Sequence, residues 1–224
     1  MLITIPLFDR FTALDAVGPF QVLVQLPGAT TVFLAERPRE VTDESGVLTL
    51  SAKASFADVP HPDIIVVPGG PGQANQMAGS PLREWLIAAD QTSTWTASVC
   101  TGSLILAGAG LLDGRQATTN WLAMDELARL GAKPRRERYV FDGKYATAAG
   151  VSAGIDMALA LVGRIGGDAM AQRFQLGIEY DPQPPHNAGS PTTAPPEIVA
   201  DLRARSRFAP PEWALGASGP GAAR

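Results

Sequence analysis

The sequence contains one cysteine and two histidines in 224 residues, and this scarcity limits the chemistry that it can support. A single thiol cannot form an internal disulfide, which fits a reducing compartment and predicts a cytoplasmic protein. Sites built from several thiolates are excluded, and two histidines provide too few ligands for a dedicated zinc site. We therefore expect no bound metal.

Long apolar runs and excess positive charge are also missing. The longest apolar stretch, residues 151–163, contains Asp156 and falls short of the roughly 18 residues that span a bilayer. The first eleven residues lack the cationic leader of a signal peptide. A formal net charge of -4 disfavours binding to phosphate backbones and anionic lipids. We expect neither a membrane nor a nucleic acid as partner.

The residues that are present alternate between strand and helix patterns. Hydrophobic residues make up 46% of the chain and charged residues 18%, which allows a sizeable core. Residues 64–67 are four consecutive β-formers that stop at Pro68-Gly69-Gly70, as expected for a central parallel strand. Further strands are expected at 2–7, 31–36, 47–50 and 94–100, a hairpin around Asp142-Gly143, and helices over 11–26, 80–90, 101–114, 121–132, 152–167 and 168–180. This order predicts an α/β fold with a doubly wound, mostly parallel sheet and helices on both faces.

The composition predicts one domain followed by an extension. Apolar residues are spread evenly over residues 1–191, which we take as a single α/β domain. After Asp181 the chain becomes rich in proline, and residues 192–224 are expected to form a C-terminal extension. This extension should contain a short helix within 197–208 and a disordered Gly/Ala-rich tail from residue 214.

Three segments end at the carboxyl edge of the predicted sheet, where doubly wound proteins bind their ligands. They are Asp15, the glycine cluster 69–72 and the turn at Cys100. Cys100 falls where a strand pattern changes to a helix pattern, so it should lie at a helix N-terminus that stabilises the thiolate. The N–H groups of Gly70 and Thr101 could then donate to charge developing on a substrate.

Each of these residues also has a purely structural interpretation. A lone cysteine is often a buried small hydrophobe, and an acid in the first turn of a helix often only caps it. The glycine cluster could be only a turn. The strand-cysteine-helix placement favours the nucleophile for Cys100, whereas position alone leaves both interpretations open for Asp15.

Several strings in the sequence resemble one known family. They are FTALDAVGPFQVL, DIIVVPGGPG, SVCTGSLILAGAGLLDGRQATTNW, AGVSAGIDMALALV and QLGIEYDPQPPHNAGSP, spread from Met1 to about Pro191. Together they resemble the isonitrile hydratase branch of the ThiJ/PfpI superfamily, which has a class I glutamine-amidotransferase-like, flavodoxin-like fold. The resemblance implies a homodimeric hydro-lyase without cofactor that adds water to an isonitrile and gives an N-substituted formamide.

The resemblance also assigns roles to residues. The family nucleophile corresponds to Cys100, the aspartate of the LDxxGP motif to Asp15, and the threonine after the cysteine to Thr101. An isonitrile carbon accepts a soft thiolate to give a thioimidate, which then needs protons and water. Asp15 is the expected general acid and base.

One position departs from the family pattern. Relatives commonly carry histidine before the tryptophan of the TTNW string, whereas this chain has Asn120. An asparagine cannot act as a base, and we expect Asn120 to cap the helix that starts at Trp121. The change puts any role of the family histidine in doubt.

Other functions use related sequences. Peptidases and amidotransferases of this fold need a cysteine-histidine pair, but Thr101 follows the cysteine and His61 and His186 lie in proline-flanked loops. Transcription regulators append a helix-turn-helix module, for which the residues after Tyr180 are too few. A redox sensor or a glyoxalase- or deglycase-like enzyme would use the same cysteine, and the sequence leaves both open.

Overall fold

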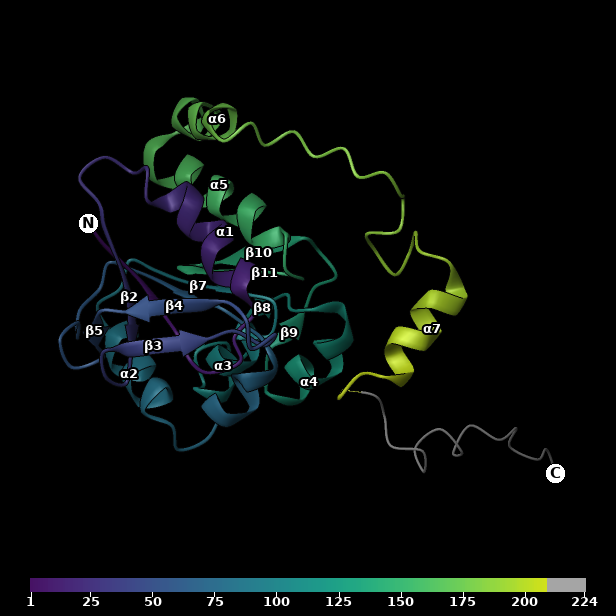
Figure 1. Cartoon of the computed structure of the whole chain (residues 1–224), viewed down its shortest axis with the longest axis horizontal. Coiled ribbons are helices and arrows are strands. Elements are labelled where there is room, and N and C mark those ends of the chain that lie inside the picture. The colour runs from purple at the N-terminus through teal and green to yellow at the C-terminus, as the bar shows by residue number, and fades with distance from the viewer. Residues whose placement is uncertain (209–224) are drawn as a thin grey trace. The chain divides into compact units, whose positions relative to one another are not determined.

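A seven-stranded sheet forms the centre of the computed structural model, which describes residues 1–208 (Figure 1). The strand order is β10-β11-β7-β6-β1-β2-β5. β10 and β11 pair antiparallel, and the other neighbours pair in parallel. The strands are β1 (Leu2–Pro6), β2 (Thr30–Ala35), β5 (Ala54–Ser55), β6 (Ile64–Val67), β7 (Trp95–Val99), β10 (Tyr139–Asp142) and β11 (Tyr145–Ala148). The prediction of a mostly parallel sheet is confirmed.

Helices cover both faces of this sheet (Figure 1). One face carries α1 (Ala13–Leu23), α5 (Ala153–Gly166) and α6 (Asp168–Gly177), and the other carries α2 (Pro81–Asp90), α3 (Gly102–Gly108) and α4 (Met124–Arg129). The start of α2 follows the predicted signals, since the Ser80 side chain accepts the Arg83 N–H at 3.1 Å and Pro81 is the first helical residue. The doubly wound α/β arrangement is thus confirmed.

The core is centred on β6, as its composition predicts. All four of its residues are buried, because β1 and β7 flank it in the sheet and helices cover both faces. Ile64 pairs with Ile3 of β1 and with Trp95 of β7. The strand therefore delivers the following glycine loop, which contains the 3-10 helix η1 (Pro71–Gln76), to the middle of the carboxyl edge.

The structure differs from the sequence expectation at several points. The strand expected at 47–50 is found two residues later as β4 (Thr49–Ala52), and it pairs antiparallel with β3 (Arg39–Thr42) outside the main sheet. Val47 and Leu48 belong to the connecting turn, because their N–H groups bond to Asp43 Oδ1 at 3.3 and 3.2 Å. The helix expected over 121–132 is split into a 3-10 turn, η2 (Trp121–Ala123), and α4, while β8 (Gln116–Ala117) and β9 (Lys133–Pro134) form a further small sheet.

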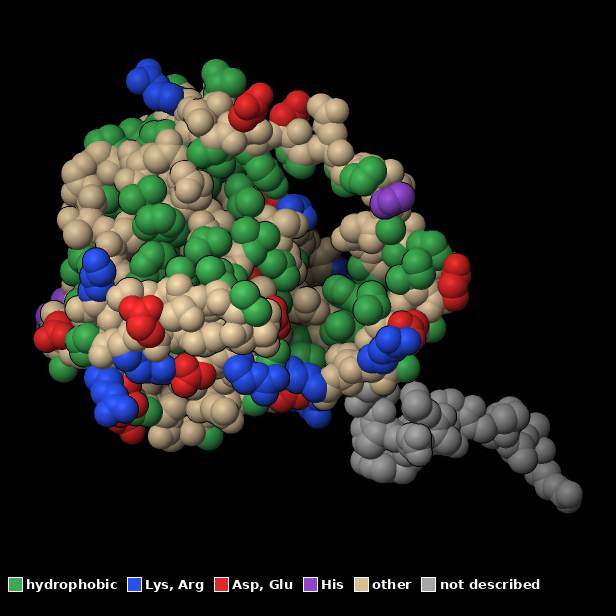
Figure 2. All heavy atoms as spheres, viewed as in Figure 1, with side chains coloured by type: hydrophobic (Ala, Val, Ile, Leu, Met, Phe, Trp, Pro, Cys, Tyr) green, Lys and Arg blue, Asp and Glu red, His purple; other side chains and the backbone are tan. Residues whose placement is uncertain are grey.

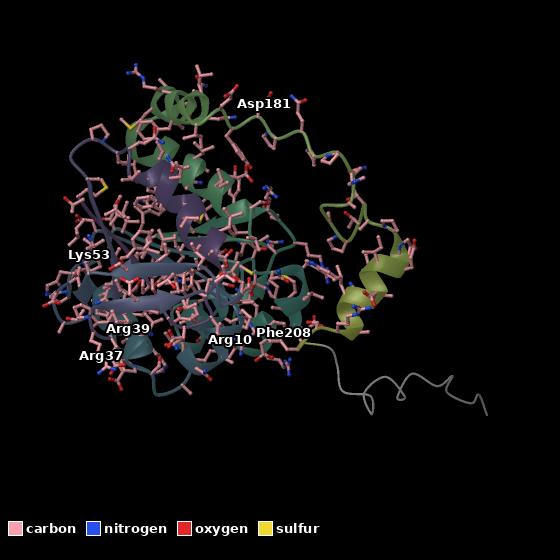
Figure 3. All side chains as sticks on the ribbon, viewed as in Figure 1. Arg10, Arg37, Arg39, Lys53, Asp181 and Phe208 are labelled. Atoms are coloured by element: carbon pink, nitrogen blue, oxygen red, sulfur yellow. The ribbon has the colours of Figure 1, made fainter. Side chains whose placement is uncertain are left out.

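Charges of both signs lie beside one another on the surface. Figure 2 shows basic and acidic side chains close together along the lower edge of the face in view. One such pair joins Arg39 Nη1 to Asp9 Oδ1 at 2.7 Å, and Arg39 is labelled in Figure 3. An exposed pair of this kind contributes little to stability.

The chain divides into two compact units, Met1–Asp181 and Pro182–Arg224. Within the second unit, which is described as far as Phe208, α7 (Pro196–Ala204) agrees with the expected short helix. The tail expected to be disordered from residue 214 lies outside the described residues, and a domain covering 1–191 stays a prediction. No helix within residues 1–208 is long and apolar enough to cross a membrane.

Candidate functional site

Cys100 occupies a tight turn between β7 and α3. Its φ of 57° is left-handed, a conformation that costs energy for any residue except glycine. Three hydrogen bonds hold it there: its N–H donates to the Ala148 carbonyl at 3.1 Å, and its carbonyl accepts from Ser103 Oγ at 3.1 Å and Thr119 Oγ1 at 3.0 Å. The turn has the form of a nucleophile elbow, as the sequence predicts.

Asp15 lies in the first turn of α1 and is fully buried. Its Oδ2 accepts the Gly69 N–H from the loop after β6 at 3.0 Å, so the carboxyl is held by a neighbouring loop. Within residues 1–208 the Asp15 carboxyl accepts this N–H and none from α1, which argues against the capping interpretation. The second oxygen, Oδ1, has no hydrogen-bond partner within residues 1–208.

Burial controls the protonation of the acid. Burial, with a smaller contribution from the charge of Glu44, raises the pKa of Asp15 from the ordinary 3.8 to about 8. The Gly69 N–H and the Cys100 side chain act in the opposite direction without overcoming burial. Near neutral pH, Asp15 therefore holds a proton.

Burial is also the largest influence on the pKa of the Cys100 thiol. It raises the pKa of Cys100, which is 6% exposed, and the neighbouring charge of Asp15 adds to this effect. Hydrogen bonds from the Thr101 backbone and the Asn120 side chain lower the pKa by less. The pKa of the thiol is therefore raised, whereas the helix N-terminus was expected to lower it. The expectation failed because it took no account of burial.

The glycine cluster lets three loops meet at this edge. A Cβ on Gly69 would lie 2.5 Å from the Thr101 nitrogen, and one on Gly70, whose φ is 124°, would lie 2.5 Å from the Thr12 nitrogen. On the far side of the same loop, the Gly72 N–H donates to the carbonyl of Arg10 at 3.1 Å; Arg10 is labelled in Figure 3. The cluster is thus required for bringing Asp15 and Cys100 together, beyond forming a turn.

The two predicted donors are neighbours in the site. The Gly70 N–H donates to Thr101 Oγ1 at 3.0 Å, and the Thr101 N–H interacts with the Cys100 thiol. Both donors are therefore directed at groups of the site itself in the absence of a substrate. Their role toward a substrate stays a prediction.

Asn120 caps a helical turn, as predicted, since its Oδ1 accepts the Leu122 N–H at 3.0 Å at the start of η2. Its side chain also acts to lower the pKa of Cys100, an influence that sequence reasoning missed. The signal that could have revealed this influence is the replacement of the family histidine at this position. A second residue that was missed is Glu44. Its charge acts to raise the pKa of Asp15, and its carboxylate accepts a hydrogen bond from Thr12 Oγ1 at 3.0 Å.

Neither a metal site in residues 1–208 nor a pairing of His61 with Cys100 is present. Residues 1–208 contain no group of three or more His, Cys, Asp or Glu side chains that could hold a metal ion. His61 Nδ1 pairs instead with Thr92 Oγ1 at 3.2 Å. The chemistry of the site therefore centres on Cys100, Asp15 and the amides around them.

The site combines a cysteine on a strand-to-helix elbow with a buried carboxyl, at the carboxyl edge of a doubly wound sheet. These features define a class of α/β proteins whose cysteine lies on such an elbow. Residues 1–164 match the DJ-1/PfpI family, and the chain belongs to this family. The resemblance found in the sequence is thereby confirmed.

Individual relatives agree with this assignment. The chain is 41% identical over 200 residues to isonitrile hydratase of Pseudomonas putida, covering 89% of this chain and 87% of that protein. The crystal structure of a ThiJ/PfpI family protein from Pseudomonas syringae superposes with a TM-score of 0.87 at 34% identity, covering 90% of this chain and 84% of that one. Oxidized DJ-1 of Toxoplasma gondii, with a TM-score of 0.71 at 22% identity, covers 81% of this chain and 99% of that chain and shows the shared fold.

Proposed function

We propose that this protein is an isonitrile hydratase that adds water to an isonitrile and releases an N-substituted formamide. The similarity to the Pseudomonas putida enzyme supports the substrate class. The observation that carries the proposal is the buried Asp15 carboxyl, which has a raised pKa and a spare oxygen at the Cys100 elbow. A protonated acid beside a sulfur nucleophile suits the reaction, because the isonitrile carbon must gain both a sulfur and a proton.

In the first step, the Cys100 sulfur forms a bond to the terminal carbon of the isonitrile, and the same carbon gains a proton. The thiol thus adds across one carbon to give a thioimidate. Because Asp15 is itself protonated, it gives its own proton to this carbon and takes up the proton that leaves the Cys100 sulfur, so the acid ends the step protonated. The Thr101 N–H would donate to the charge that develops on the substrate, and the Gly70 N–H would do so after releasing Thr101 Oγ1.

In the second step, water adds to the thioimidate carbon, and Asp15 gives its proton to the nitrogen while it accepts one from the water. The carbon-sulfur bond then breaks, the carbonyl forms, and the remaining proton of the added water goes to the Cys100 sulfur. The products are the N-substituted formamide and the free thiol, so the net reaction consumes one isonitrile and one water. No electron donor or acceptor is needed.

The burial of the thiol favours hydration over redox sensing. A sensor cysteine is typically an accessible thiolate with a lowered pKa. Cys100 has little exposure, and burial raises its pKa. A glyoxalase- or deglycase-like reaction would use the same cysteine, so it is kept as an outcome of the assay below.

We also propose that the protein is a homodimer. Leu14 on α1 and Val24 just after it are 39% and 41% exposed, and Figure 2 shows further hydrophobic side chains in this region of the visible face. Val47 in the turn between β3 and β4 is 86% exposed. Apolar surface of this kind is typical of an interface. Sedimentation velocity at micromolar concentration should show a dimer, and a monomer would contradict this proposal.

The cytoplasmic location stays a prediction.

The experiment that tests the function incubates the purified protein with an aryl isonitrile and identifies the product by mass spectrometry. We expect the formamide from the wild-type protein and none above background from the Cys100→Ala variant. This variant should remain folded, because one small side chain replaces another and alanine can be accommodated in the same space.

Two results would contradict the proposal. Equal formamide production by the Cys100→Ala variant would exclude a covalent role of the cysteine. Turnover of a 1,2-dicarbonyl compound without turnover of the isonitrile would support the glyoxalase-like alternative. Circular dichroism of both proteins controls for unfolding.

A further inference from the structure

The backbone of Cys100 is hydrogen-bonded on both sides to other segments of the fold. Its N–H donates to the Ala148 carbonyl at 3.1 Å, and its carbonyl accepts from Thr119 Oγ1 at 3.0 Å. Ala148 is the last residue of β11, and Thr119 lies between β8 and η2. The nucleophile is thus anchored at its nitrogen and at its carbonyl by segments that are distant from it in the sequence.

The two anchoring segments are also joined to each other. The Thr118 N–H donates to Thr147 Oγ1 at 2.9 Å. These two threonines directly precede Thr119 and Ala148, so the hydrogen bonds close a ring that includes Cys100. All three threonines are almost fully buried, where a hydrogen bond is stronger than in water.

This ring holds a backbone conformation that is unfavourable for Cys100. Its φ of 57° is left-handed, and such a conformation persists only where the surroundings enforce it. Ser103 Oγ also donates to the Cys100 carbonyl, at 3.1 Å, but Ser103 belongs to the first turn of α3, directly after the elbow. Of these two donors, Thr119 is the one that ties the carbonyl to a separate part of the fold.

We propose that Thr119 is a positioning residue for the nucleophile and acts through the backbone of Cys100. Its hydroxyl fixes the left-handed turn, and the turn fixes the direction in which the Cys100 side chain leaves the backbone. Without this bond, the turn could relax toward the conformations that residues with a side chain prefer. A displacement of about 1 Å is sufficient to slow a reaction about a hundredfold.

Four variants separate positioning from stability. Thr119→Val keeps the shape of the side chain and removes the donor, Thr119→Ala removes the donor without placing a methyl group against the carbonyl, and Thr119→Ser keeps the donor. The matched control is Thr4→Val. Thr4 is fully buried in β1, and its Oγ1 donates to the Ile64 carbonyl at 3.2 Å, at the amino end of β6 and away from the elbow.

The measurements are kcat and KM with an aryl isonitrile, thermal melting, and NMR of protein made with isotope-labelled cysteine. Because the chain has one cysteine, the Cα signal of Cys100 can be followed alone, and its shift reports the backbone conformation.

We expect Thr119→Val and Thr119→Ala to lower kcat about ten- to a hundredfold, to change KM by less than about twofold, and to displace the Cys100 signal. Thr119→Ser should recover most of the wild-type kcat. Thr4→Val should melt earlier, because it also loses a buried hydrogen bond, and should keep the wild-type kcat and signal.

Wild-type kcat in both Thr119→Val and Thr119→Ala would overturn the proposal and leave this hydrogen bond with a structural role only. An equal fall of kcat in Thr4→Val would also overturn it, since the loss of any buried hydroxyl would then be sufficient. The kinetic measurement rests on the proposed function, whereas the NMR signal requires no isonitrile. A displaced signal in both variants, together with a wild-type protein that does not hydrate isonitriles, would support the role of Thr119 and reject the proposed substrate.

Discussion

Asp15 and Asp90 are both buried aspartates, but their surroundings differ. Asp90, the last residue of α2, accepts Thr96 Oγ1 at 2.6 Å and the Tyr145 hydroxyl at 2.8 Å, and Lys144 Nζ lies 3.1 Å from it. Asp15 accepts one backbone N–H through Oδ2 and leaves Oδ1 without a partner in the described residues. Both oxygens of the Asp90 carboxyl therefore have polar partners, whereas only one oxygen of the Asp15 carboxyl does.

The two aspartates also lie near opposite ends of the strands β7 and β11, with Asp90 near their starts and Asp15 near their ends. Thr96 and Tyr145 stand near the starts of β7 and β11, whereas Cys100 and Ala148 are at their ends. Ligands of doubly wound proteins bind at the carboxyl ends. The comparison indicates that a buried acid with complete partners fixes the fold, while one with a spare oxygen at the carboxyl edge is available for chemistry.

The largest expected effect is on activity at Asp15. In the Asp15→Asn variant the amide oxygen can still accept the Gly69 N–H, but the side chain can no longer carry a proton. We expect kcat for isonitrile hydration to fall by roughly two to four orders of magnitude, the usual contribution of a positioned acid or base. A fully active Asp15→Asn enzyme would remove the distinction between the two aspartates.

Asp90 should show the reverse pattern. Asp90→Asn places an amide opposite two hydroxyl donors and removes the charge that pairs with Lys144, so we expect a loss of about 2–4 kcal/mol in the free energy of unfolding. Urea titration measures this loss. The folded fraction at low temperature should retain wild-type kcat, and a specific loss of kcat would show that Asp90 acts in the site.

The smallest effect concerns the pH dependence of stability. Because folding raises the pKa of Asp15 from 3.8 to about 8, the folded state binds this proton more tightly than the unfolded state. Its contribution to stability is therefore lost as pH rises through this range. Asp15→Asn should melt a few degrees later than wild type at about pH 8 and gain less at about pH 5. Calorimetry at both values tests this, and an equal shift at both would contradict a raised pKa.

The sequence was sufficient for the features that local pattern controls. The β-formers at 64–67, the Ser80 cap and the change of pattern at Cys100 predicted the central strand, the start of α2 and the elbow. Asp15 and the glycine loop were predicted to meet because the carboxyl ends of parallel strands share one edge. Polar β3 was missed, since its strand depends on pairing with β4.

Features that depend on tertiary contacts could not be predicted. The hydrogen bond from Thr119 Oγ1 to the Cys100 carbonyl joins two segments whose proximity no local pattern encodes. The same holds for Asp90 and Tyr145, which meet across 55 positions of sequence. The direction of the thiol pKa was missed because it is set by how completely the surrounding loops exclude water.

The left-handed backbone at Cys100 affects which residue would be most stable at this position. Its backbone conformation suits glycine, so the chain forgoes roughly 1 kcal/mol of stability by keeping a side chain there. Mutation and selection for thermal robustness alone would replace the cysteine and erase the reactive sulfur. A stability-driven redesign of this protein would therefore have to hold residue 100 fixed to keep its sulfur.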